Sequence, residues 1–358
     1  MRALLLNPGP VSLSPGVRSA ATAVDLCHRE PEYFDLQDSV RRMLLQVYEL
    51  GAEEWTPVLL GGSGTAAMEA MMVSLLAEDS NVLILENGVY GERFRRLAVI
   101  HGLQHSALAF DWLQAWNLHE IRSTLVEENF THVAAVHHET TTGRLNPVGP
   151  LAELCEQAGA TLLLDTVSSF GAEAIPFDSP ALGACALTAN KCLHGIPGLC
   201  VVMVRNPALA ACVQPPRSLT LNLALWAEHQ QQRSTPFTPP VNALLALEQA
   251  LRELRGGGGW PSRHARYHRM AEKVCRSLAG RNVAGLIPED ESSCVLRSYR
   301  LPKGSSYAQV HDALKLRGFV VYAGQGQFAD GIFRISTMGD IGDYDVDRLL
   351  TALGEVFC

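Results

Sequence analysis

Short apolar runs alternate with helix-like stretches between Trp55 and Val204. Several runs, such as Leu162-Leu163-Leu164, lack the polar alternation of a half-exposed strand, which is typical of strands buried on both faces of a mostly parallel sheet. The pattern therefore predicts an α/β domain in which helices flank that sheet. Strands are predicted at 57–60, 81–85, 132–137, 161–165, 185–188 and 200–204. Helices are predicted at 37–50, 66–77, 91–101, 112–127 and 150–157.

The pattern changes after this region. Residues 206–240 are less regular and rich in proline, and a strong helical pattern follows over 241–254. The glycine run 256–259 ends that helix and is a natural joint. Beyond it, helices are predicted at 263–278, 308–317 and 344–356, and strands at 293–299, 318–322 and 332–337. We therefore predict an N-terminal arm over 1–14, a large domain over 15–255 and a small α+β domain over 256–358.

Length and charge narrow the choice of function. The chain has 358 residues, enough for two domains, because single cores stop growing near about 250–300 residues. The formal charge of −8 argues against a nucleic-acid surface. The densest basic stretch, 263–269, is interpreted as the solvated face of a helix. No apolar run reaches the ~18 residues of a membrane span, and the run at 1–6 is too short for a signal peptide.

The nine cysteines are scattered, with no C-x-x-C pair. This spacing indicates reduced thiols and a cytoplasmic location rather than a disulfide framework. The nearest thing to a metal-ligand cluster is His137-His138, and adjacent residues of a strand point to opposite faces. We therefore expect no structural metal.

The most informative chemistry lies at two strand ends. The strand 161–165 ends in Asp165, which would place a carboxylate at the carboxyl edge of the sheet, where open α/β folds bind ligands. Lys191 follows the next predicted strand and can reach the same crevice. An amine and a carboxylate are what pyridoxal 5'-phosphate (PLP) requires, one to hold its aldehyde and one to keep its ring nitrogen protonated. Taken alone, the pair is explained equally well by a turn-capping Asp and a surface Lys.

Three further loops follow predicted strands. The Gly-rich turn 61–65 precedes a helix, whose backbone N–H groups could bind a phosphate, and it lacks the Gly-Lys-Ser/Thr of a P-loop. Tyr90 in the loop 87–91 could stack on an aromatic ring, although ordinary packing is the more frequent use of such a residue. The Thr run 140–142 could offer a hydroxyl, or only form a turn. Together these loops would supply what one PLP molecule needs.

With these motifs the sequence resembles the class V, fold-type I aminotransferases, which are PLP-dependent, and within them the 2-aminoethylphosphonate:pyruvate transaminases. The resemblance covers nearly the whole chain. It depends on the motifs at 6–10, 62–65, 87–91, 138–143, 165–171, 189–192, 195–198 and 333–335.

The resemblance implies a role for each matching residue. Lys191 would bind the cofactor as a Schiff base, Asp165 would meet the pyridinium, Tyr90 would stack on the ring and Thr140 would contact its edge. The cofactor phosphate would be held by Ser63, Gly64, Thr65 and Asn190. Thr238 would complete the phosphate site of a partner subunit, so the expected active unit is a homodimer with an arm over each active site.

Arg334 resembles the substrate-anion arginine of this family, because its planar fork suits a carboxylate or phosphonate bidentately. The alternative is a surface arginine on a strand. The expected reaction is the reversible transamination of 2-aminoethylphosphonate with pyruvate to give phosphonoacetaldehyde and L-alanine.

The segment 27–33 departs from the usual catabolic phosphonate enzymes and keeps an alanine:glyoxylate or serine:pyruvate aminotransferase open as an alternative. A more remote alternative is a PLP-fold protein that binds a partner without turnover. The intact pair of Lys191 and Asp165 argues against that reading.

Overall fold

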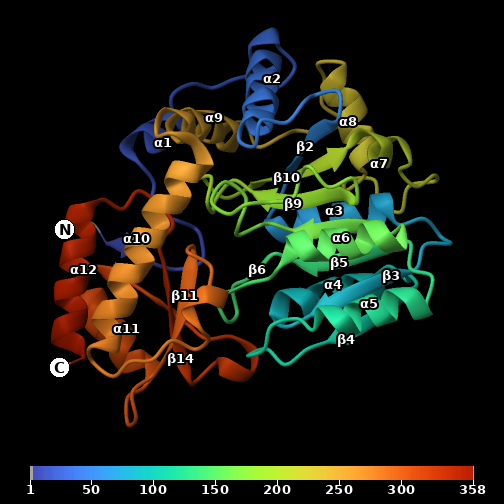
Figure 1. Cartoon of the computed structure of the whole chain (residues 1–358). Coiled ribbons are helices and arrows are strands. Elements are labelled where there is room, and N and C mark those ends of the chain that lie inside the picture. Colours follow the sequence, from blue (N-terminus) through green and yellow to red (C-terminus); the bar gives the residue numbers. More distant parts are fainter. Residues whose placement is uncertain (1–2, 358) are drawn as a thin grey trace.

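A seven-stranded sheet forms the centre of the computed structural model, which describes residues 3–357 (Figure 1). Its strands lie in the order β2-β10-β9-β8-β5-β3-β4. Of these, β10 runs antiparallel to both of its neighbours, and the other recorded pairs are parallel, so the sheet is mostly parallel as predicted. The strands are β2 (Trp55–Gly61), β3 (Val82–Glu86), β4 (His105–Ala109), β5 (His132–Val136), β8 (Thr161–Asp165), β9 (Leu182–Thr188) and β10 (Leu199–Arg205).

Alternate residues of the central strands enter two separate cores. Leu162 and Leu164 of β8 pack on one face of the sheet, whereas Leu163 packs on the other, which explains why the strand shows no polar alternation. The first face is covered by α2 (Pro31–Gln46), α5 (Leu118–Glu127), α6 (Val148–Ala158) and α9 (Val241–Gly256). The second is covered by α3 (Gly64–Leu75), α4 (Val89–Ile100) and α8 (Leu223–Gln231).

The C-terminal part has a core of its own beside a three-stranded sheet of order β11-β14-β13. Its elements are α10 (Gly259–Ala279), β11 (Leu296–Arg300), α11 (Tyr307–Leu316), β12 (Phe319–Val320), β13 (Tyr322–Ala323), β14 (Ile332–Ser336) and α12 (Asp343–Val356). The N-terminal strand β1 (Leu4–Leu5) joins this part by pairing with β12. The smaller elements are α1 (Pro15–Ala20), β6 (His138–Glu139), β7 (Arg144–Leu145), α7 (Asn206–Ala210), η1 (Glu289–Glu291) and η2 (Gly326–Phe328).

Several element boundaries differ from the sequence prediction. The edge strand β4 was not predicted because none of its five residues is buried, so it shows no continuous apolar run. Helix α5 begins at Leu118 rather than 112, because the side chain of Asn117 caps its first turn. The run 318–322 divides between β12 and β13, which belong to different sheets. The three-part division at 14 and 255 stays a prediction, and residues 1, 2 and 358 lie outside the described residues.

Two other expectations concern the basic stretch 263–269 and the membrane. Arg263 was predicted on a solvated helix face, and this was wrong, since it is buried and donates a hydrogen bond to the carbonyl of Cys192. Within residues 3–357, no helix is both long enough and apolar enough to cross a bilayer.

Candidate active site

Sheet topology gathers the predicted loops at one edge. Because β10 alone runs the opposite way, the carboxyl ends of β2, β9, β8, β5 and β3 lie on the same side of the sheet. Register places Gly61 of β2 opposite Leu199, beside the pair formed by Cys200 and Thr188. The Gly-rich turn after β2 and the lysine loop after β9 therefore flank the start of β10.

Asp165 is the last residue of β8 and is buried. Its Oδ1 accepts a hydrogen bond from the backbone N–H of Val167 at 2.8 Å. Burial raises the pKa of the Asp165 carboxyl, while the Val167 N–H and the charges of Lys191 and Arg93 favour its ionised form. Lys191 and Arg93 are thus the cations whose charges act on this carboxylate.

Lys191 lies beside the ring of Tyr90, with 5.7 Å between its Nζ and the ring centroid. The guanidinium carbon of Arg93 lies 4.5 Å from the same centroid, and its Nη1 donates to Oγ1 of Thr65 at 2.8 Å. Arg93 therefore connects the Gly-rich turn with the aromatic ring. No motif in the sequence marks Arg93, although its position three residues after Tyr90 on α4 is the spacing of neighbours on a helix surface.

The Gly-rich turn packs directly against the segment that follows Asp165. A Cβ on Gly64 would lie 2.5 Å from Cγ1 of Val167, so only glycine permits this approach. Ser63 is the N-cap of α3 but makes no side-chain cap, and the first turn contains no acidic residue. An uncapped helix N-terminus of this kind suits a phosphate. The side chain of Asn190 is oriented by Thr188, whose hydroxyl donates to its Oδ1 at 2.8 Å.

Thr140 presents a buried hydroxyl without a partner. Thr140 is 1% exposed, and Oγ1 makes no hydrogen bond with any of the described residues. Unpaired buried hydroxyls cost free energy, and such atoms are expected where a ligand supplies the partner. Thr140 thus fits the role of contacting a cofactor edge.

Glu139 holds the Tyr90 loop, a role the sequence analysis did not assign. Its fully buried carboxylate accepts the backbone N–H of Tyr90 at 3.1 Å, and the N–H and hydroxyl of Thr141 at 3.0 and 2.6 Å. A Cβ on Gly88 would approach Cδ of Glu139 to 2.2 Å, so the glycine makes room for the carboxylate. Burial raises the pKa of Glu139, and the three hydrogen bonds oppose that effect. The loop after β3 is thereby fixed to the loop after β5.

Arg334 lies on β14 and is 0% exposed, so the alternative of a surface arginine was wrong. Its Nε donates to the carbonyl of Ala323 at 2.7 Å, and its Nη1 donates to the carbonyl of Thr140 at 2.8 Å. Burial lowers the pKa of the guanidinium, and the nearby Tyr90 and Glu139 oppose that shift. Arg334 thus places a positive charge of the C-terminal sheet at the crevice of the central sheet.

Comparison with known proteins agrees with this geometry. A sequence profile of the family described as Aminotransferase class-V matches residues 44–327. The chain belongs to the class V aminotransferases. A 2-aminoethylphosphonate–pyruvate transaminase of Aeromonas hydrophila is 38% identical to it over 98% of this chain and 94% of that protein. A protein of the same name from Vibrio cholerae is 36% identical, over 98% and 96% of the two chains.

Solved structures of aminotransferases share the fold. A subgroup IV aspartate aminotransferase of Thermus thermophilus superposes with a TM-score of 0.91 at 27% identity, covering 99% of each chain. An alanine–glyoxylate aminotransferase of Nostoc superposes with a TM-score of 0.92 at 26% identity, covering 100% of this chain and 96% of that one. The predicted α/β fold of this family is therefore confirmed.

The N-terminal segment of this aminotransferase reaches the lysine. Gly9 has a φ of +111°, and a Cβ there would lie 3.1 Å from Cγ of Lys191 and 3.2 Å from the carbonyl oxygen of Asn190. A larger residue would be strained and would press on the lysine. The segment that contains Gly9 thus lies against Lys191.

Thr238 is exposed on the loop that precedes α9. None of the contacts among residues 3–357 connects it with the crevice of its own chain. Its neighbour Phe237 packs against Trp226, and Pro240 lies 3.6 Å from the Cβ position of Gly61, at the end of β2. The described contacts thus leave the predicted role of Thr238 at a phosphate site untested.

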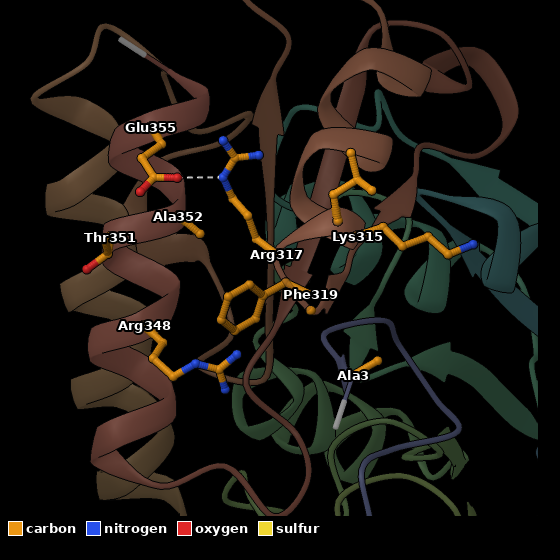
Figure 2. A pocket seen from close by; sticks show the side chains of 10 residues that line it. Ala3, Lys315, Arg317, Phe319, Arg348, Thr351, Ala352 and Glu355 are labelled. Atoms are coloured by element: carbon orange, nitrogen blue, oxygen red, sulfur yellow. Dashed lines mark hydrogen bonds and ion pairs between the residues drawn. The ribbon is translucent and has the colours of Figure 1, made fainter. Parts of the chain in front are cut away.

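Two other features of this aminotransferase lie outside the crevice. A pocket of about 600 Å³ lies between α11, β12 and α12, where Lys315, Arg317 and Arg348 are accompanied by Glu355 (Figure 2). The side chains of Glu173, His264 and Cys294 have their polar atoms within 4.8 Å of one another, and their hydrogen bonds join the segment after β8 to α10 and to the segment before β11.

Proposed function

We propose that this protein transfers the amino group of 2-aminoethylphosphonate to pyruvate, reversibly, with PLP bound at Lys191, giving phosphonoacetaldehyde and L-alanine. The observation that carries the proposal is the burial of Arg334. Its guanidinium places a positive charge at the same crevice as Lys191 and Asp165. Full-length relatives at 34–38% identity named for this reaction support the choice of substrate.

The residues at the crevice fit PLP. The uncapped start of α3, with Ser63, Gly64, Thr65 and the nearby Asn190, would hold its phosphate. Asp165 would keep a proton on the ring nitrogen, Tyr90 would cover the ring, and the unpaired hydroxyl of Thr140 would reach its edge. When bound, PLP supplies an electron-withdrawing ring that acidifies the C–H bond next to the substrate amine.

The chain's own residues do the rest of the work. The amine of Lys191 would act as the general base and acid that accepts the proton from the amine-bearing carbon of the substrate and gives it back to complete the transfer. Asp165, whose ionised form is favoured by the Val167 N–H and by the charges of Lys191 and Arg93 against the effect of burial, would hold the proton on the ring nitrogen. Arg334 orients the phosphonate in one half-reaction and the pyruvate carboxylate in the other, because both are anions.

The second candidate is an alanine:glyoxylate or serine:pyruvate aminotransferase. The superposition with the Nostoc alanine–glyoxylate enzyme favours it, although the identity of 26% is lower than the 38% of the phosphonate relative. This candidate would use the same cofactor residues and a carboxylate donor.

Amino-donor profiling tests the proposal. The purified protein, loaded with PLP, is assayed with 2-aminoethylphosphonate, L-serine and L-alanine as donors and pyruvate or glyoxylate as acceptor. We expect the highest kcat/KM for 2-aminoethylphosphonate with pyruvate. Full activity with serine and none with the phosphonate would reject the first candidate in favour of the second, and no exchange with any donor would favour a binding protein.

We also propose a cytoplasmic homodimer in which Thr238 completes the partner's phosphate site. The exposure of Thr238 supports this, and so do the free thiols of the described cysteines. Mixing a Thr238→Ala chain with a Lys191→Ala chain tests it, because a hybrid dimer would contain one intact site. Recovery of activity above that of either variant is expected, and its absence would show that Thr238 acts within its own chain or not at all.

A further inference from the structure

The donors of Arg334 are mostly committed to the protein. A guanidinium has five N–H groups and no acceptor. The Nε–H goes to the carbonyl of Ala323, and the two N–H groups of Nη1 go to the carbonyl of Thr140 and to Oε1 of Gln325, the last at 3.2 Å. Nη2 alone, with two N–H groups, has no hydrogen-bond partner recorded within residues 3–357. The bidentate fork expected from the sequence is therefore not free for an anion.

A phosphonate needs more donors than one nitrogen offers. It has three oxygens around phosphorus, whereas a carboxylate has two, and each charged oxygen removed from water has to regain its hydrogen bonds. The two N–H groups of Nη2 can donate one hydrogen bond to each oxygen of a carboxylate. With a phosphonate they leave the third oxygen without a donor. A residue next to Arg334 can supply the additional donor.

Gln325 is placed to supply it. Because a guanidinium can only donate, the amide oxygen of Gln325 must face Arg334, and its NH2 group, with two further N–H donors, is turned away from Nη1. No described hydrogen bond occupies that NH2 group. The residue is only partly exposed, in the segment between β13 and η2.

Packing fixes this segment. A Cβ on Gly324 would lie 1.9 Å from the carbonyl oxygen of Phe328, so the backbone there is in close contact. Gly326 has a φ of +55°, and its Cβ would lie 2.6 Å from the ring of Trp112, which also packs against Phe328. The close contacts at Gly324 and Gly326 thus fix the backbone on both sides of Gln325, beside Arg334 and next to Trp112.

We infer that Gln325 is a specificity-determining residue, whose amide N–H groups bind the phosphonate oxygen that Arg334 leaves unmet and so favour phosphonate over carboxylate substrates. This inference rests on the proposed function for the identity of the anion. Gln325 acts directly on the substrate, while Arg334 supplies the charge common to both substrates.

The test compares Gln325→Ala and Gln325→Leu with Gln327→Ala, a matched control that removes an exposed glutamine two residues away. Binding of two unreactive anions, ethylphosphonate and propionate, is measured by calorimetry on the PLP-loaded protein. Loss of a hydrogen bond to a charged group should weaken ethylphosphonate about 10- to 100-fold, and propionate less than about threefold. The control should bind both anions like the wild type, and kcat/KM for 2-aminoethylphosphonate should fall more than that for L-alanine.

Two results would overturn the inference. Equal losses for both anions would mean that Gln325 only positions Arg334, and unchanged or tighter binding of ethylphosphonate would mean that Gln325 merely occupies Nη1 until an anion displaces it. Failure of the proposed function is recognised separately, because wild-type protein would then exchange no amino group with 2-aminoethylphosphonate. The calorimetric comparison would still decide the role of Gln325.

Discussion

Two buried carboxylates, those of Asp165 and Glu173, differ in how many hydrogen bonds the protein gives them. Asp165 has one protein donor, the N–H of Val167, and burial raises its pKa. Glu173 accepts hydrogen bonds from the hydroxyl of Ser293 at 2.5 Å and the N–H of Cys294 at 3.1 Å, and pairs with His264 at 3.2 Å. Burial alone would raise the pKa of Glu173, but these partners lower it to about 2.

This difference in hydrogen bonding distinguishes the crevice, as a ligand site, from a structural junction formed by Glu173, His264, Ser293 and Cys294. The crevice leaves buried polar atoms, such as Thr140 Oγ1, without protein partners, whereas the Glu173 cluster supplies its carboxylate with partners from α10 and the segment before β11. Unmet buried groups cost stability and are retained where a ligand completes them. Changes in the crevice should therefore reduce activity and leave stability intact, and changes at the junction should do the reverse.

The largest expected effect is that of Lys191→Ala. Without the amine that moves the proton, kcat/KM with 2-aminoethylphosphonate should fall by ~10⁴-fold or more. The midpoint of urea unfolding should stay within error of the wild type, since the Lys191 side chain makes no hydrogen bond with any of residues 3–357. Steady-state kinetics and circular dichroism check both parts. Retained amino-group exchange in this variant would place the reacting amine elsewhere.

Asp165→Asn comes next. The amide removes the negative charge at the ring nitrogen, so kcat should fall about 10²- to 10³-fold, the range for losing one preorganised electrostatic contact. Stability measured without PLP should be unchanged or higher, because the wild-type carboxylate is buried at a cost. A large drop in the unfolding midpoint would mean that Asp165 belongs with the junction rather than the crevice.

Glu173→Gln should show the opposite result. A pKa lowered from 4.5 to about 2 in a buried carboxylate corresponds to about 3 kcal/mol of folding free energy. Because the folded pKa is depressed, this contribution is present above about pH 4.5 and is lost as the pH falls towards 2. Urea unfolding at pH 7 and at pH 3.5 should show the gap between variant and wild type shrinking at the lower pH. A kcat of the surviving folded protein far below that of the wild type would contradict the assignment.

The smallest expected effects compare two hydroxyls. Ser293→Ala removes a donor to Glu173 and should cost about 1 to 2 kcal/mol of stability with unchanged kcat. Thr140→Val removes a hydroxyl that makes no hydrogen bond among the described residues, so stability should not fall, and affinity for PLP should weaken by about tenfold, the value of one hydrogen bond. Thermal unfolding and fluorescence titration with PLP would measure the two. Equal stability losses would erase the distinction between the regions.

The sequence was most informative in the loops that directly follow the strands of the central sheet. The apolar runs gave the central strands and their order along the chain, and the motifs after them marked Lys191, Asp165, Tyr90 and Thr140, which the fold brings to one edge. Residues such as Arg93 and Gln325 carried no motif of their own. Their importance comes from what they contact, Thr65 in one case and Arg334 in the other.

By itself, the sequence determined the α/β architecture, the family and the loops that bear the chemistry, because hydrophobic periodicity and short motifs are local properties of the chain. Only the tertiary structure decided which buried polar atoms are paired. Arg334 meets Thr140 across 194 positions and Glu173 meets Ser293 across 120. The physical reason is that a buried donor or acceptor must find a partner in three dimensions, and no local pattern specifies which distant residue will supply it.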